Sequence, residues 1–142
     1  MIQNILDHKG DRVITALPTQ TVKDAADTMR EHGIAALVVK GGNTVIGMIS
    51  ERDIVNAISR SGAAALSMLV SEIASHDIVA VTPYDSLKRA MRLMTNHRVR
   101  HLPVMSDSRL VGIVSIGDVV KLRLADLEVE TNVLRDVYIA AR

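Results

Sequence analysis

The chain has 142 residues, 48% of them hydrophobic and 23% charged, which predicts one globular domain or two small ones that share a core. It has no Phe, Trp or Cys, and its 17 basic and 16 acidic side chains leave a net charge of +1. These counts exclude disulfides and thiolate metal sites, and they argue against a nucleic-acid partner, because neither a basic excess nor an aromatic stacking platform is present. The N-terminus lacks a signal-peptide pattern and no apolar run reaches about 18 residues, so we expect a cytoplasmic protein with no membrane partner.

The first predicted elements are a short strand and an amphipathic helix. Residues Arg12–Ala16 are rich in β-branched side chains, which favours a strand. Thr21 is of a residue type that caps helices, and Gly33 lies where a left-handed residue would end the helix. Between them, apolar side chains recur at the spacing i, i+3, i+4 and i+7 of one helix face, at Val22, Ala25, Ala26 and Met29.

Two further strands and a second helix complete this unit. Strands are expected at Ala35–Val39 and Val45–Ile49, joined by a turn at residues 41–43, whose sequence is Gly-Gly-Asn. A second helix begins after Ser50. The predicted order is therefore strand, helix, strand, strand, helix, and one such unit cannot cover both faces of its own sheet.

The same unit occurs a second time, beginning with a strand at Ile78–Val81. A shift of 65 positions gives 11 identities over the 45 positions from Ile14 to Ile58, without a gap. We therefore predict an α/β (α+β) fold in which two β-α-β-β-α repeats pack sheet to sheet as one module. Its predicted parts are repeat 1 (residues 7–60), a linker (61–75), repeat 2 (76–124) and a helical tail (125–142) that packs on the module or on a second subunit.

Each copy contains one phrase that could carry chemistry: glycine, two apolar residues, serine, two residues, aspartate, at Gly47–Asp53 and Gly112–Asp118. Serine and aspartate at this spacing form a capping box, and Thr21 and Asp24 show the same spacing without the glycine. A ligand site is the alternative, because an aspartate at a helix start can accept from a ribose diol and free N–H groups there favour phosphate. The recurring glycine indicates that another group approaches the backbone closely. The spacing alone leaves capping and ligand binding open.

The doubled phrase, in register in both copies, resembles that of the CBS domain pair, also called a Bateman module. The resemblance extends from about Asp7 to Leu124 and includes the segment Arg100–Val104, with sequence Arg-His-Leu-Pro-Val. It is strongest to short stand-alone bacterial CBS-pair proteins. It implies a non-enzymatic sensor that binds an adenosine-containing ligand (AMP, ADP, ATP, NAD(H) or S-adenosylmethionine) in two clefts between the repeats. It also implies a homodimer that regulates another, unidentified protein.

The resemblance further implies which residues bind the ligand. Asp53 and Asp118 would hold the ribose hydroxyls, with Ser50 and Ser115 at the ribose or the α-phosphate. Each cleft would be composite, with the base against one repeat and the ribose aspartate from the other. The residues implied to face Asp118 are Thr15, Ile34 and Ala35, and those implied to face Asp53 are Ala80, Val99 and Arg100. The residues implied at phosphates are Arg52, Arg100 and His101, and Pro103, which follows the last two in the second strand, is also implied to belong to the site.

The two copies differ around these positions, so we expect the two clefts to differ in affinity or in ligand. Arg98 and Arg100 of the second copy stand where the first copy has Gly33 and Ala35. Three more basic residues precede them on the predicted helix, where a solvated face explains them: Lys88, Arg89 and Arg92.

Other functions find less support in the sequence. The five histidines show no metal-ligand spacing, and Ser115 lies in no Gly-x-Ser-x-Gly elbow that would make His101, Ser115 and Asp118 a hydrolytic triad. We therefore predict no enzyme activity, no catalytic cofactor and no metal. The alternative from another class is a structural dimerisation scaffold with vestigial clefts. A nucleic-acid binder would need salt-dependent binding at the basic residues 88–101.

Overall fold

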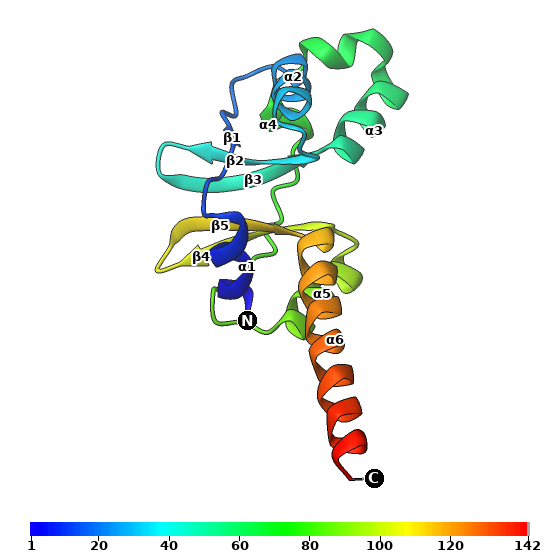
Figure 1. Cartoon of the computed structure of the whole chain (residues 1–142). Coiled ribbons are helices and arrows are strands. Elements are labelled where there is room, and N and C mark those ends of the chain that lie inside the picture. Colours follow the sequence, from blue (N-terminus) through cyan, green and yellow to red (C-terminus); the bar gives the residue numbers. More distant parts are fainter. Residues whose placement is uncertain (142) are drawn as a thin grey trace.

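The computed structural model describes residues 1–141 and consists of two halves whose sheets face each other (Figure 1). Arg142, the last residue of the predicted tail, lies outside the described residues. Helices cover the outer face of each sheet, so each half buries its own apolar core and the two sheets meet in the middle of the molecule (Figure 1). In chain order the elements are α1 (Ile2–Lys9), β1 (Thr15–Ala16), α2 (Val22–His32), β2 (Ala36–Gly41), β3 (Thr44–Ser50), α3 (Glu51–Ser61), the 3-10 helix η1 (Gly62–Ser67), α4 (Val70–Ile73), α5 (Leu87–His97), β4 (His101–Ser106), β5 (Arg109–Ser115) and α6 (Ile116–Ala140).

The first half confirms the predicted order of its elements. Its sheet has the order β1-β2-β3, with β1 parallel to β2 and β2 antiparallel to β3. Thr21 forms a capping box with Asp24 at the start of α2, and Gly33 ends that helix in the left-handed conformation with φ 63°. The first strand is shorter than predicted, since only Thr15 and Ala16 pair with β2.

The second half repeats the first with one strand fewer. The strand expected at Ile78–Val81 is reduced to a single bridge between Val81 and Val104. The next rung of the ladder would pair Ala80 with Pro103, as Thr15 pairs with Val38 in the first half. Pro103 has no N–H to donate to that rung, so the pairing stops after one residue.

The helix before each repeat packs on the core of the other half. Ile2, Ile5 and Leu6 of α1 belong to the second core, while Val70 and Ala74 at α4 belong to the first. Residues 61–75, predicted as a linker, thus form η1 and α4 and close the first core. The chain crosses twice between the halves, which joins them into one body.

Both cores are aliphatic, and a third buried layer lies between the sheets. Leu37 and Val39 of β2 pack among the helices of the first half, whereas Ala36 and Val38 alternate to the opposite face and are also buried. Pro103, at the position equivalent to Val38, is buried in β4. The buried inner faces support the predicted packing of sheet against sheet.

The last helix is longer than a repeat requires. The second helix of repeat 2 and the predicted tail form one continuous helix, α6, of 25 residues. It extends away from the rest of the molecule (Figure 1). No helix within residues 1–141 is both long and apolar enough to cross a membrane.

Candidate functional site

The two serine–aspartate phrases form complete capping boxes at the starts of α3 and α6. Asp53 Oδ2 accepts from the Ser50 N–H at 2.8 Å, and Ser50 Oγ accepts from the Asp53 N–H at 3.3 Å. Asp118 Oδ2 accepts from the Ser115 N–H at 2.9 Å, and Ser115 Oγ accepts from the Asp118 N–H at 3.1 Å. The capping interpretation left open by the sequence is therefore correct for both phrases.

Capping uses only one oxygen of each carboxylate. Within residues 1–141 every hydrogen bond to the carboxylates of Asp53 and Asp118 falls on Oδ2, so Oδ1 of each remains available as an acceptor. Both aspartates are partly buried, whereas Asp24 of the third capping box is exposed. Each of the two aspartates therefore caps a helix with Oδ2 and, at a partly buried position, keeps Oδ1 as an unused hydrogen-bond acceptor.

The recurring glycine has a structural cause, because a protein segment approaches it closely in each half. A Cβ on Gly112 would lie 2.5 Å from Leu6 Cδ2 of α1, and a Cβ on Gly47 would overlap the backbone carbonyl oxygen of Ser75. Met48 and Ser75 also exchange backbone hydrogen bonds of 3.0 and 2.8 Å. The close group inferred from the glycines is therefore the helix or segment that precedes the other repeat.

One side-chain hydrogen bond joins the two halves beside Asp53. Arg52 Nη1 donates to the Arg98 carbonyl oxygen at 3.3 Å, which brings the segment before β4 against the start of α3. The predicted neighbours Val99 and Arg100 follow directly in that segment. For Asp118, the predicted composite partners Thr15, Ile34 and Ala35 make no hydrogen bond or ion pair with it in the described part of the chain.

Backbone contacts place Ala35 and Arg100 beside the helix start of their own repeat. The Glu51 N–H donates to the Ala35 carbonyl oxygen at 3.0 Å, and the Ile116 N–H donates to the Arg100 carbonyl oxygen at 2.8 Å. The end of the second strand and the start of the helix thus form one corner in each repeat. The pair Ala35–Glu51 in the first repeat is equivalent to the pair Arg100–Ile116 in the second.

His101 lies in the second of these corners, opposite Ser115 in the β4–β5 ladder. Burial lowers the pKa of His101 below its ordinary value, and the positive charges of Lys9 and Arg100 lower it further, against the opposing effects of Asp118 and Glu51. The imidazole is therefore neutral near pH 7, where it can donate one hydrogen bond and accept another.

Lys9 is a residue of this corner that the sequence analysis missed. Its Nζ donates to Asp118 Oδ2 at 2.7 Å and to the Ile113 carbonyl oxygen at 3.0 Å. Partial burial raises the pKa of Asp118, but the hydrogen bonds from Lys9 and Ser115 outweigh it and hold that pKa below its ordinary value. The 65-residue shift places Ala74 at the equivalent position, so Asp53 has no such lysine. Extending the repeat alignment upstream of Ile14 would have shown this difference.

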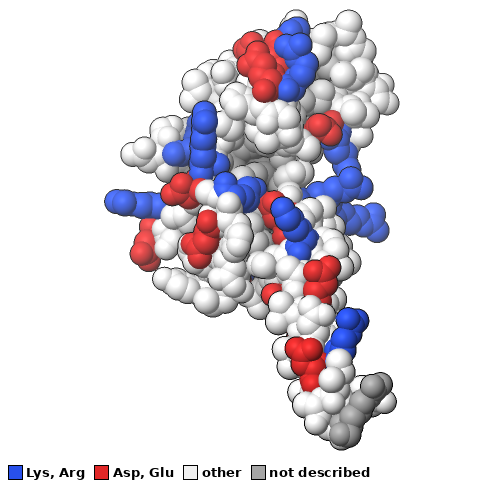
Figure 2. Space-filling view, in the orientation of Figure 1, with Lys and Arg blue, Asp and Glu red and all other residues white. Residues whose placement is uncertain are grey.

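The remaining predicted residues vary in accessibility. Pro103 is buried, and Thr15, Arg52 and Arg100 are exposed. Those of intermediate exposure are Ile34, Ala35, Ser50, Asp53, Ala80, Val99, His101, Ser115 and Asp118. On the visible face in Figure 2, basic side chains gather at the level where the two halves meet, beside the start of α6.

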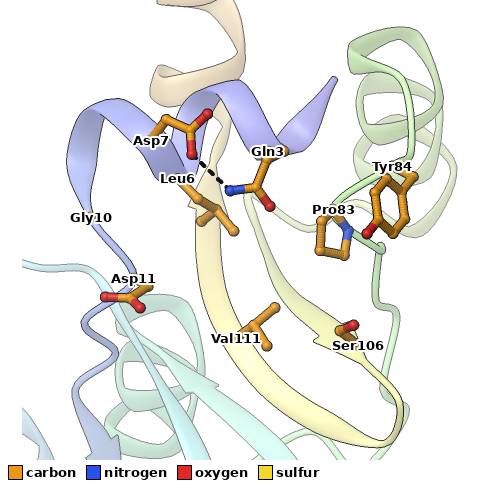
Figure 3. Close-up of a pocket in the computed structure, with 9 residues that line it drawn as sticks. All are labelled: Gln3, Leu6, Asp7, Gly10, Asp11, Pro83, Tyr84, Ser106 and Val111. Carbon is orange, nitrogen blue, oxygen red and sulfur yellow. Dashed lines mark hydrogen bonds between the residues drawn. The ribbon is translucent and has the colours of Figure 1, made fainter.

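A surface hollow of about 370 Å³ lies elsewhere, between α1 and the β4–β5 hairpin (Figure 3). Gln3 and Asp7 on its wall are joined by a hydrogen bond of 2.8 Å, and Tyr84 stands at its side (Figure 3). None of the predicted ligand residues lines it. Within residues 1–141, no group of three or more His, Asp or Glu could hold a metal ion.

Fold and site together define a tandem-repeat α/β module with one capped aspartate corner in each copy. The family model of the CBS domain matches residues 8–60 and 70–125. The chain therefore belongs to the CBS domain family, and it is a CBS-domain pair. It is 42% identical over 106 residues to the mitochondrial CBS domain-containing protein CBSX3 of Arabidopsis thaliana. That match covers 71% of this chain and about half, 52%, of the relative.

Solved structures show the same fold. The CBS-domain protein ATU1752 of Agrobacterium tumefaciens superposes with a TM-score of 0.84 and 40% identity, over 86% of this chain and 92% of that one. The CBS domain pair of protein MJ0100, solved with 5′-methylthioadenosine and S-adenosyl-L-methionine, superposes with a TM-score of 0.78 over 89% of this chain and 97% of that one. At 22% identity the second likeness shows the fold alone.

Proposed function

We propose that this CBS pair is a cytoplasmic, non-enzymatic regulatory module that binds an adenosine-containing ligand between its repeats, AMP, ADP, ATP and NAD(H) being the candidates. The observation that carries the proposal is the state of the two aspartates. Asp53 and Asp118 are partly buried and each keeps Oδ1 available, which a ribose hydroxyl can use as an acceptor. Asp24, which caps a helix in the same way, is exposed.

The surroundings supply groups for the rest of such a ligand. Arg52 and Arg100 are exposed cations, and guanidinium groups bind phosphate with two parallel hydrogen bonds. His101 in its neutral form offers one donor and one acceptor in the corner of Asp118. The ligands of the MJ0100 CBS pair both contain adenosine, which supports this ligand class.

Ligand binding would act by shifting the populations of two conformations. A ligand that contacts both repeats favours the conformation in which they are correctly placed, by an amount set by its differential affinity for the two states. We propose that the module works as a homodimer and that the shift is read by a regulated protein, not yet identified.

A structural dimerisation scaffold is the second candidate, and one observation favours it. Both serine–aspartate phrases form complete capping boxes and both glycines are explained by packing, so no ligand is required to account for these residues. The two functions differ in whether a ligand stabilises the fold.

The test is thermal unfolding of the full chain with AMP, ADP, ATP, NAD⁺, NADH and, as a control, CMP. A ligand at a concentration of about 100 Kd stabilises the native state by about 2.7 kcal/mol, which is on the order of 5–10 °C in Tm for a chain of this size. We expect at least one adenosine ligand to produce such a rise and CMP to produce none. If millimolar concentrations of every adenosine ligand leave the melting curve unmoved, the scaffold is the correct function. Native mass spectrometry of freshly purified protein would identify a co-purified nucleotide by its mass.

A further inference from the structure

The outer part of α6 carries apolar side chains that no other element within residues 1–141 covers. Val119 is the last buried residue, and every described residue from Arg123 onward is exposed. Leu124, Leu134 and Val137 are 55%, 70% and 61% exposed. A single helix with no tertiary contacts is only marginally stable in water, and apolar patches of this kind mark interaction sites. This segment therefore needs a partner surface.

One face of the segment has the repeat of a coiled coil. Starting at Gly117, positions separated alternately by three and four residues carry no charge along the whole of α6 and at the residue that follows it. They are Gly117, Val120, Leu124, Leu127, Thr131, Leu134, Tyr138 and Ala141. This is a sustained heptad pattern, with Leu124, Thr131 and Tyr138 at a positions and Val120, Leu127 and Leu134 at d positions. We call these eight positions the seam.

A second apolar stripe on the helix is interrupted. Leu122, Val129 and Val133 share another face, but the positions that would complete it are Asp126 and Asp136. A continuous dry contact can therefore form on the seam and not on this second stripe.

Thr131, a polar member of the seam, is compatible with burial. The Thr131 hydroxyl donates to the Leu127 carbonyl oxygen of its own helix at 2.9 Å, so its hydrogen-bonding need is met when the seam is covered. A hollow of about 490 Å³ also follows the inner end of the seam, where a partner's side chains could enter. It is lined by Gly117, Val120, Lys121, Leu124, Ala125 and Glu128.

The charges beside the seam specify the partner and its direction. In a parallel, in-register pair, each g residue lies against the e residue five positions further along the other helix. The two pairs of this kind are Arg123 with Glu128 and Glu130 with Arg135, and both join opposite charges. Within residues 1–141 none of these four side chains forms an ion pair, so all four are available. The complementary surface is therefore the same helix of a second copy.

We propose that residues 120–140 of α6 form a parallel, two-stranded coiled coil with the same segment of a second copy of this chain. Leucine at the d positions 127 and 134 is the choice that parallel two-stranded coiled coils make. Arg123 lies against Glu128 of the partner subunit, and Glu130 against Arg135 of the partner subunit. The inference specifies how the proposed homodimer is held together, and it fails or stands independently of ligand binding.

Cysteine cross-linking of the full chain tests both the contact and its direction. The chain has no native Cys, so Val120→Cys and Leu134→Cys each introduce one thiol. In a parallel, in-register coil a d residue faces its own copy, and we expect both variants to form a disulfide-linked dimer under mild oxidation. Val129→Cys, on the interrupted stripe, is the control and should remain monomeric on a non-reducing gel. Cross-linking at only one of the two seam positions, at neither, or equally at Val129 overturns the proposal.

Charge reversal gives a second, independent arm. Sedimentation equilibrium should show at least a tenfold weaker dimer for Arg135→Glu, because two like-charge contacts with Glu130 are created in each dimer. The double variant Glu130→Arg with Arg135→Glu restores both attractions and should recover the wild-type dissociation constant. Failure of this rescue, or an unchanged dissociation constant in the single variant, contradicts the parallel arrangement.

Discussion

At the scale of single residues, capping uses one carboxylate oxygen of each aspartate and leaves the other for the proposed ligand. Oδ2 of Asp118 holds the Ser115 N–H and the Lys9 ammonium, while Oδ1 takes no bond within residues 1–141. In Asp53, Oδ2 accepts from Ser50 only, and Oδ1 takes no bond within the same residues. A substitution that removes the carboxylate therefore removes both the cap and the proposed ligand contact, and a matched capping aspartate is needed to separate them.

Asp118→Ala is expected to weaken binding of the adenosine ligand more than it weakens folding. A hydrogen bond to a charged acceptor is worth roughly 1.5–3 kcal/mol, so losing the ribose bonds should raise Kd on the order of tenfold to a hundredfold or more. Loss of a cap alone costs about 0.5–2 kcal/mol of stability. Asp24→Ala is the control, since Asp24 caps α2 with the same geometry. Calorimetric titration and urea midpoints for both variants decide the matter: equal behaviour in both measurements would mean that Asp118 is only a cap.

His101 makes stability depend on pH. Its folded pKa lies below the ordinary value because it is partly buried, so the unfolded chain binds the proton more readily. The contribution of His101 is complete above about pH 6.5, the ordinary pKa, and is lost as the pH falls toward the lower folded pKa. Urea midpoints at pH 7.5 and 5.5 should differ less for His101→Gln than for the wild type. His32→Gln, at an exposed helix end, is the control for the loss of a histidine. An NMR titration that places the pKa of His101 at or above 6.5 would contradict this account.

At the scale of elements, the two repeats are locked by segments that belong to the other half. The end of α1 packs on β5 at Gly112, and Ser75, after α4, pairs with β3 beside Gly47. Each glycine is therefore a packing requirement of the crossing chain. The two sites differ in what an added methyl group would meet, a leucine side chain at Gly112 and a backbone carbonyl at Gly47.

Gly47→Ala is expected to destabilise the protein more than Gly112→Ala. The end of a leucine side chain can rotate away, whereas a carbonyl in a paired segment moves only with its backbone. Overpacking of a core costs about 1–3 kcal/mol, and we expect Gly112→Ala near the lower end and Gly47→Ala near or above the upper end. Gly41→Ala is the control, since an added Cβ there meets only ordinary contacts of 3.7 Å. Chemical denaturation of the three variants gives the order, and a Gly112 variant less stable than the Gly47 variant would reverse the argument.

At the scale of the whole molecule, the internal symmetry is broken at the two aspartate corners. Lys9 from the N-terminal helix engages Asp118, while Ala74, its equivalent, is buried in the first core and leaves Asp53 without a lysine. Arg98 and Arg100 likewise replace Gly33 and Ala35. The module thus presents two corners of the same geometry with different charge.

We expect calorimetric titration to resolve two unequal affinities, or one ligand per chain. Lys9→Ala should change only one of them, because Lys9 contacts Asp118 and has no counterpart near Asp53. The direction of the change in affinity shows the role of Lys9. Binding becomes tighter if Lys9 competes with the ligand for the Asp118 carboxylate, and weaker if Lys9 contacts the ligand's phosphates. Two identical and independent sites in the wild type would show that the broken symmetry has no effect on the ligand.

The sequence by itself determined the features that depend on local or periodic patterns. The 65-residue repeat, the caps at Thr21, Ser50 and Ser115, and the end of α2 at Gly33 all follow from residue type and spacing along a short stretch of chain. The caps and the helix end involve groups within a few residues of one another, and the repeat is visible in the residue types themselves, so the sequence contains their physical cause. The ligand roles assigned to the site residues remain predictions.

Only the tertiary structure decided the contacts between segments far apart in the chain. The bond from Lys9 to Asp118 spans 109 positions, and the crossing of α1 and α4 between the halves leaves no periodic signal in either helix. The loss of a strand at residues 78–81 depends on a missing N–H at Pro103, more than 20 residues away. Such contacts depend on how the two sheets are stacked. That stacking is set by burial of the whole apolar surface, which no single stretch of sequence contains.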